Sequence, residues 1–191
     1  RGLGDVYKRQ VGCAFMAHHD RRTTNGNPRL TNPGDDRAMS AYIRPKVPGA
    51  SVFFTVALAD RGARTLVEHV EVLRDAVRVT RAERPFRIDA WVVLPDHMHA
   101  VWTLPEGDHD FSTRWSVIKA RFSRAMPHTP RRRSHGERRE HGLWQRRFWE
   151  RHIRDDADWA NHVHYCWINP VKHGYVDRPE DWPYSSYHRD R

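Results

Sequence analysis

Cysteine is scarce in this chain: Cys13 and Cys166 are the only two among 191 residues. Two cysteines cannot build a disulfide framework or a four-cysteine zinc site, so we expect a protein of a reducing compartment. No apolar run approaches the roughly 18 residues of a membrane span. No secretory signal with a charged start and a cleavage site is visible either, so we expect a cytoplasmic protein with no membrane partner.

The sequence also lacks the GxxxxGK[ST] loop that cradles nucleotide phosphates, so we expect no nucleotide cofactor. Acidic residues are outnumbered: 33 lysines and arginines oppose 24 aspartates and glutamates, which gives a formal net charge of +9. Such an excess favours a polyanionic partner. Eight tryptophans, seven phenylalanines and six tyrosines distinguish the chain from basic disordered tails and indicate a folded body.

The N-terminal part has no apolar period. Its NGNPRLTNPGDD run consists of turn formers, and the opening RGLGDVYKRQ has no initiator methionine. We expect residues 1–45 to be poorly structured and in part a remnant of sequence assembly. Residues 46–175 are expected to form the folded domain. Residues 176–191 are expected to form a C-terminal tail packed near the functional site, because their aromatic side chains would otherwise be exposed.

Hydrophobic periodicity predicts an α+β fold. Apolar or alternating runs predict four strands, and amphipathic spacing predicts three helices. The expected strands cover residues 51–59, 86–94, 97–104 and 142–153; the expected helices cover residues 65–80, 110–126 and 155–169, the last of them stopped by Pro170. This order suggests a sandwich in which a central antiparallel sheet of four to five strands carries helices on one face.

A His-x-His pair in the third expected strand is the sharpest chemical feature. Successive strand side chains alternate between faces, so His97 and His99 point the same way and Met98 points into the core. Their Cβ atoms then lie roughly 6–7 Å apart, which allows both imidazoles to reach one divalent ion. The plain alternative is two exposed histidines on a sheet. His162 and His164 have the same spacing, but in a helix they diverge, and we expect both at the surface.

The last expected helix offers candidates to complete such a site. Tyr165 and Asn169 are four residues apart and therefore share a helix face. A tyrosine beside a divalent ion can act as a nucleophile, and an amide oxygen is a suitable third ligand for Mg²⁺ or Mn²⁺. A core or interface aromatic is the alternative interpretation of Tyr165.

Basic residues are the candidates for holding nucleic-acid phosphates. They comprise Arg114, Lys119 and Arg121 of the second expected helix, Arg131, Arg132 and Arg133 of an Arg-rich loop, and Arg146, Arg147 and Lys172 beside the proposed site. A solvated charged face is the alternative for many of them. Tryptophans could stack on unpaired bases, although core packing is the simpler role for any single one.

Several segments together resemble the REP-associated tyrosine transposases, which belong to the HUH single-tyrosine superfamily and are related to transposases of the insertion sequence 200 group. The matching segments are LPDHMHAVW, the IKARFSRAM helix, GLWQRRFWERHIRDD, HYCWINPVKHGYV and DWPYSSYH. The resemblance spans nearly the whole expected folded part. It implies an HUH-type ferredoxin-like fold in a bacterial, nucleoid-associated protein.

The resemblance also implies a site and a reaction. Position by position, it makes His97 and His99 metal ligands, Asn169 the third ligand and Tyr165 the nucleophile, with Mg²⁺ or Mn²⁺ as the cofactor. The implied activity is that of a metal-dependent single-stranded DNA endonuclease and strand transferase. Such an enzyme acts on repetitive extragenic palindrome (REP) hairpins through a 5′-phosphotyrosine intermediate. The sequence leaves open whether the protein is a monomer or a dimer.

Two other functions fit parts of the sequence. The same fold could serve a non-catalytic protein that binds hairpin DNA or RNA, although the presence of all four site residues argues against lost catalysis. A metal-dependent hydrolase could use the His pair alone. That function gives Tyr165 no role, and neither an HExxH motif nor paired carboxylates support it.

Overall fold

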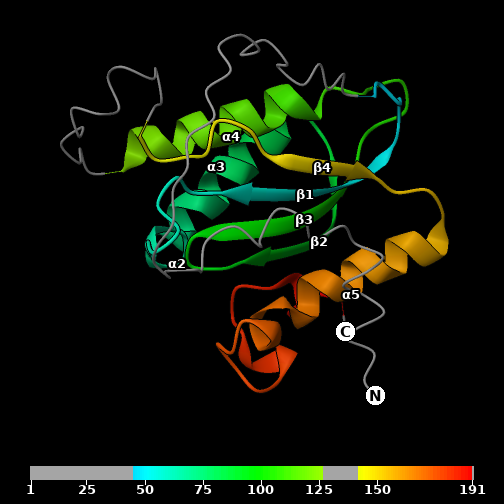
Figure 1. The fold of residues 1–191 in the computed structure, drawn as a ribbon. Helices are drawn as coiled ribbons and strands as arrows, with labels where there is room; N and C mark the ends of the chain where they lie inside the picture. The colour runs from blue at the N-terminus through cyan, green and yellow to red at the C-terminus, as the bar shows by residue number, and fades with distance from the viewer. Residues whose placement is uncertain (1–44, 127–141, 191) are drawn as a thin grey trace, which may run out of the picture. The chain divides into compact units, whose positions relative to one another are not determined.

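The structure is a computed structural model in which residues 45–126 and 142–190 are described (Figure 1). The prediction that residues 1–45 are poorly structured therefore concerns residues outside the described ranges, except for residue 45. The predicted Arg131–Arg133 loop lies outside these ranges as well. In the described ranges no helix is long and apolar enough to cross a membrane. The elements in chain order are β1 (Ser51–Ala57), α2 (Thr65–Glu68), α3 (Val70–Glu83), β2 (Arg87–Val93), β3 (His97–Thr103), α4 (Phe111–Ala125), β4 (Trp149–His152), α5 (Asp156–Lys172) and two 3₁₀ turns, η2 (Pro179–Asp181) and η3 (Ser186–His188).

The four strands form one antiparallel sheet in the order β2-β3-β1-β4. β3 and β1 occupy the centre, and their register sets Thr55 opposite His99. β4 is shorter than the predicted range 142–153, because Trp144 makes only an isolated bridge to Leu58. The α+β architecture predicted from periodicity is confirmed, with a strand number within the expected four to five.

Helices cover both faces of this sheet, whereas the sequence predicted helices on one face (Figure 1). Phe53 and Phe54 of β1 are neighbours and point in opposite directions. The Phe54 ring lies 5.6 Å from that of Trp115 on α4, and the Phe53 ring lies 5.7 Å from that of Tyr165 on α5, between centroids. Strand periodicity shows that a face is buried but not which helix buries it. In the structure, α5 packs on β2 and β3 from the face opposite α4.

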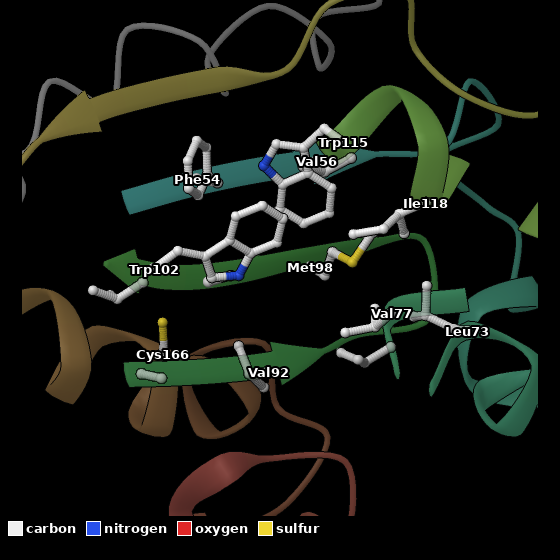
Figure 2. Packing of buried hydrophobic residues seen from close by; sticks show 14 of the residues in the cluster. Phe54, Val56, Leu73, Val77, Val92, Met98, Trp102, Trp115, Ile118 and Cys166 are labelled. Carbon is white, nitrogen blue, oxygen red and sulfur yellow. The ribbon is translucent and has the colours of Figure 1, made fainter. Parts of the chain in front are cut away.

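A large part of the hydrophobic core lies between the sheet and the helices α3 and α4 (Figure 2). Trp102 of β3 stacks on Trp115 of α4 with ring centroids 4.2 Å apart, and both side chains are fully buried. Met98 lies on the same face of β3 and is also fully buried, as the alternation predicted. The odd-numbered residues of β3, including the His pair, are thereby left to the face that α5 covers.

Two predicted helices differ from the structure. The helix expected over residues 65–80 is broken at His69, whose φ of −119° and ψ of 35° are not helical, although no Gly or Pro marks the break. The last helix continues past Asn169, with Pro170 inside it. It ends instead before Gly174, whose φ of 70° is the left-handed conformation that commonly stops helices.

The C-terminal segment covers the edge of β2. The Val93 N–H donates to the Tyr184 carbonyl at 2.9 Å, and the Trp182 indole N–H donates to the Val93 carbonyl at 2.9 Å. Trp182 in turn stacks on Tyr175, with ring centroids 5.3 Å apart. The segment therefore pairs with one sheet edge and places aromatic rings beside the end of α5.

Candidate active site

His97 and His99 project from β3 toward α5. Their ring centroids lie 5.1 Å apart, and the rings are nearly perpendicular, at 87°. Both residues are almost completely buried, with exposed fractions of 1% and 2%. The prediction that they share a face is confirmed, and the alternative of two exposed sheet histidines is wrong.

One ring nitrogen of each histidine is held by a neighbouring side chain. Nδ1 of His97 lies 2.6 Å from Oδ1 of Asp96, and Nδ1 of His99 lies 2.9 Å from Oγ1 of Thr55. Because a carboxylate only accepts hydrogen bonds, Asp96 fixes the His97 proton on Nδ1 and leaves the Nε2 lone pair available. The Nε2 atoms of both histidines are buried and have no hydrogen-bond partner among the described residues.

α5 and its C-cap present Tyr165, Asn169 and His173 at four-residue intervals, so these side chains follow one another along one helix face. The two outer residues contact the His pair. Ring centroids lie 5.1 Å apart for Tyr165 and His99, and 5.1 Å apart for His173 and His97. Asn169 is one turn from each of these contacts and is 1% exposed. The helix thus places Asn169 between the two contacts with the histidines.

Buried polar atoms without partners are rare in folded proteins, so each one calls for an explanation. Seven such side-chain atoms occur in the described part of the chain, and three of them are His97 Nε2, His99 Nε2 and Asn169 Oδ1. Two imidazole nitrogens and an amide oxygen form a donor set that fits a divalent cation. Residues 45–126 and 142–190 hold no cluster of three or more His, Cys, Asp or Glu side chains suited to a metal; the third donor of this set is an amide.

The protonation states also suit metal binding. Burial holds the pKa of His99 well below its usual value, and the charges of Arg61 and Lys172 lower it further. A neutral imidazole is the form that binds a metal. Burial by itself raises the pKa of the Asp96 carboxyl, but the hydrogen bond from His97 and the charge of Arg61 outweigh it, so that this pKa is lowered overall.

The second His pair behaves as helix geometry requires, with one correction. His162 is 2% exposed, its Nδ1 lies 2.7 Å from the Asp158 carbonyl oxygen, and its ring lies 4.8 Å from that of Phe53. His164 is exposed. The predicted divergence is confirmed, but the expected surface position is wrong for His162, because α5 turns that residue toward the sheet.

Sequence reasoning missed four residues around the His pair: Thr55, Arg61, Asp96 and His173. The position of Asp96 directly before His97 was a usable signal. Thr55 is brought to the site by the register between β1 and β3, and His173 by the seating of α5 on the sheet. The register cannot be read from local spacing. The four-residue interval from Asn169 to His173 was a usable signal, but the helix was expected to end at Asn169.

Arg114 is engaged within the protein, which does not favour its predicted DNA contact. This residue is 4% exposed. Its guanidinium donates to the backbone oxygens of Arg84, Pro85 and Asp110 and pairs with the carboxylate of Asp108. The charge of Arg114 therefore serves the junction between the end of α3 and the start of α4.

Lys119 and Arg121 are also engaged within the protein. Nζ of Lys119 donates to the Gln145 carbonyl at 2.7 Å, and burial lowers its pKa to about 8. Arg121 donates to Oγ1 of Thr80 at 2.8 Å and pairs with Glu83, both on α3. Because α4 lies on the sheet face away from the His pair, the structure does not favour the predicted phosphate contacts of these two residues.

The remaining basic candidates in the described residues are accessible. Arg146 and Arg147 are exposed in the segment before β4. Lys172 is exposed at the end of α5, and its Nζ lies 4.7 Å from the centroid of the Tyr165 ring. These positions leave the phosphate-binding prediction open for all three.

Relatives of known identity share most of this chain. No family model matches it. A REP-associated tyrosine transposase of Escherichia coli (strain K12) is 47% identical over 152 residues, which cover 80% of this chain and 85% of that protein. A Haemophilus influenzae protein that carries the same name provisionally is 45% identical over 154 residues, which cover 80% of this chain and 88% of that protein.

The fold agrees with a solved structure of the REP-associated tyrosine transposase bound to a REP hairpin. The two chains are 46% identical, and the match has a TM-score of 0.69 and covers 80% of this chain and 85% of the other. Sequence identity and fold therefore lead to the same conclusion. The chain belongs to the family of REP-associated tyrosine transposases.

Proposed function

We propose that the protein is a metal-dependent single-stranded DNA endonuclease and strand transferase of the HUH single-tyrosine type. The observation that carries the proposal is the meeting of β3 and α5, which sets Tyr165 against His99. The unpartnered donors His97 Nε2, His99 Nε2 and Asn169 Oδ1 would hold Mg²⁺ or Mn²⁺. When bound, the ion would supply positive charge that polarises the scissile phosphate.

Tyr165 supplies the nucleophile in this proposal. Its phenol oxygen attacks phosphorus, a new P–O bond forms, and the bond between phosphorus and the 3′-oxygen breaks. The phenol proton passes to solvent, and the departing 3′-oxygen takes up a proton, which gives a free 3′-OH and a 5′-phosphotyrosine. Attack by another 3′-OH reverses the step and rejoins the strand. One phosphodiester is exchanged for another, so the reaction requires no nucleotide cofactor.

The surroundings of Tyr165 support this role. The rings of Phe53 and His99 contact its ring at 5.7 and 5.1 Å between centroids, which restrains its orientation. The ammonium of Lys172 lies over the same ring at 4.7 Å. A cation beside the phenol attracts the phosphate that the phenol must attack.

The proposed DNA partner is a single strand that carries a REP-type hairpin, because the relative of known structure is bound to one. Arg146, Arg147 and Lys172 are the described candidates for phosphate contacts. Trp149 of β4 is 41% exposed and pairs with Thr55, on the sheet face of His99, so it is a candidate for base stacking. The contacts of Arg131, Arg132 and Arg133 stay predictions.

The test of the proposed function is an incubation of purified protein with end-labelled hairpin DNA and Mn²⁺ or Mg²⁺. We expect a protein–DNA adduct that survives denaturation, together with a product that ends in 3′-OH, and we expect neither in the presence of a chelator. Hairpin binding without cleavage would instead support the non-catalytic alternative. Metal-dependent cleavage without an adduct would support a hydrolase.

A further inference from the structure

Arg61, in the loop between β1 and α2, lies beside the His pair. Its Nε is 3.2 Å from Oδ2 of Asp96, and its Nη2 is 3.4 Å from Nδ1 of His97. The Arg61 side chain is 41% exposed, whereas that of Asp96 is 9% exposed. Asp96 therefore holds the Nε–H of the guanidinium in the site, while the Arg61 side chain as a whole stays partly exposed.

Asp96 connects Arg61 to the proposed metal ligand. Its Oδ1 lies 2.6 Å from Nδ1 of His97, and its Oδ2 binds Nε of Arg61. A carboxylate with its two oxygens engaged in this way fixes the orientation of both partners. The guanidinium is thus positioned relative to the imidazole by a single intervening group.

The loop that carries Arg61 is fastened to the turn before β3. The Leu58 N–H donates to the Asp96 carbonyl at 2.8 Å, and the Leu66 N–H donates to the Pro95 carbonyl at 3.1 Å. Within the loop, the Gly62 N–H donates to Oδ1 of Asp60 at 2.9 Å. Backbone bonds on both sides of Arg61 hold the loop, and Asp96 holds the guanidinium, before any substrate arrives. A group positioned in advance stabilises developing charge most effectively.

The charges around the His pair favour an anion. Two permanent cations lie beside the His pair: Arg61 contacts Asp96 and His97, and the ammonium of Lys172 lies over the Tyr165 ring. Asp96 is the carboxylate that faces Arg61. An excess of positive charge at a partly open site attracts a negative ligand. The two non-bridging oxygens of a phosphodiester match the fork of N–H groups on a guanidinium.

We propose that Arg61 binds a non-bridging oxygen of the scissile phosphate with the N–H groups that are turned away from Asp96, and stabilises the charge on that phosphate as Tyr165 attacks. The inference rests on the proposed function, because it requires phosphoryl transfer at this site. In such reactions the protein contributes mainly by positioning groups and stabilising charge. Asp96 is the positioning residue, since it holds Arg61 and His97 in one arrangement.

The first test compares Arg61→Ala with Arg61→Lys and with the control Arg64→Ala, which removes an exposed arginine from the same loop. The quantity measured is the rate constant of adduct formation at saturating hairpin DNA with Mn²⁺. Arg61→Ala should lower it by about 10²–10³-fold, the effect of removing one pre-positioned donor. Arg61→Lys should recover part of the rate, because it restores the charge but not the fork. Arg64→Ala should react like the parent.

The second test removes the other partner of the contact. A methylphosphonate at the scissile position replaces one non-bridging oxygen by a methyl group. With one of its two diastereomers, the further slowing caused by Arg61→Ala should nearly vanish, because both changes remove the same interaction. If the rate losses caused by Arg61→Ala and by the methylphosphonate multiply in both diastereomers, Arg61 does not touch that phosphate and the proposal is overturned.

Metal affinity separates a phosphate contact from a purely structural role. Without DNA, Arg61→Ala should bind Mn²⁺ like the parent in calorimetry, whereas Asp96→Asn should bind it about 10–100-fold more weakly. An equal loss of Mn²⁺ affinity in both variants would mean that Arg61 only supports His97, and this would contradict the proposal. If the parent forms no adduct, the proposed function itself has failed. If the parent reacts and Arg61→Ala reacts as fast, only the assignment of Arg61 has failed.

Discussion

His99 and Tyr165 lie with their ring centroids 5.1 Å apart, at an angle of 73° between the rings, where β3 meets α5. A strand positions the first residue and a distant helix positions the second. Phe53 contacts both rings, at 5.6 and 5.7 Å between centroids. The geometry of the proposed reaction therefore depends on how α5 is seated on the sheet as much as on the reacting groups themselves.

Replacing His97 or His99 by Ala should remove most of the affinity for Mn²⁺, because each change deletes one of three proposed donors. Calorimetric titration of the DNA-free proteins measures this directly. The matched control is His164→Ala, which removes an exposed histidine of α5 and should bind Mn²⁺ like the parent. Equal affinity in His97→Ala and the parent would refute the metal site.

Asn169 should control how strongly the metal stabilises the fold. A ligand that binds only the folded state raises the melting temperature, and it does so more when it binds more tightly. Asn169→Ala should therefore reduce the rise caused by Mn²⁺, and Asn169→Asp should keep or increase it, since a carboxylate is a stronger ligand. Thermal denaturation with and without Mn²⁺ measures the difference. The same rise in all three proteins would remove Asn169 from the ligand set.

Stability should fall on mild acidification. Burial lowers the pKa of His99 well below its usual value and also lowers the pKa of His162. The unfolded chain takes up protons at these imidazoles near the usual pKa of about 6.5, and the folded chain does so only at lower pH. The stability contributed by these neutral imidazoles is thus fully present above the pKa of the unfolded chain. It is lost as the pH falls from that pKa through the lower pKa values of the folded chain.

Urea denaturation at about pH 7.5 and at about pH 5.5 measures this dependence, because the window lies around the unfolded histidine pKa. His99→Gln should flatten it, since one of the depressed imidazoles is gone. His164→Ala, at an exposed position, should leave it unchanged. Higher stability at the lower pH would contradict the argument.

The elements that carry the site could be predicted because their signals are local. Alternation placed His97 and His99 on one face, and four-residue spacing placed Tyr165 and Asn169 on one face. The meeting of these two faces depends on α5 crossing the sheet opposite α4, which no local period encodes. For the same reason Thr55 and Arg61 were missed. His173 was missed because the helix was expected to end at Asn169, and Asp96 was missed although it stood next to a predicted ligand.

Charge was the weakest guide. Counting basic residues ranked Arg114 with the DNA contacts, yet its guanidinium is buried and holds three carbonyl oxygens and a carboxylate. Sequence alone cannot separate a solvated arginine from one that joins two segments, because the side chain is long enough for either role. The helix end shows a similar limit: Pro170 suggested a stop that Gly174 supplies one turn later.

Arg114→Ala should therefore destabilise the protein by about 2–4 kcal/mol, because it removes a buried guanidinium that holds three carbonyl oxygens and the Asp108 carboxylate together. Arg147→Ala, which removes an exposed arginine, should change stability by no more than about 0.5 kcal/mol. Urea denaturation of both variants makes the comparison. A fully stable Arg114→Ala that binds hairpin DNA weakly would restore the predicted DNA contact.

The most direct measurement of the central claim is mass spectrometry of peptides from the covalent protein–DNA adduct. The account predicts that the nucleotide is attached to the peptide containing Tyr165, and that Tyr165→Phe binds hairpin DNA but forms no adduct. The exposed Tyr175 provides the control, since Tyr175→Phe should still form one. An adduct that persists in Tyr165→Phe, or a nucleotide attached to Tyr175, Tyr184 or Tyr187, would contradict the assignment of the nucleophile.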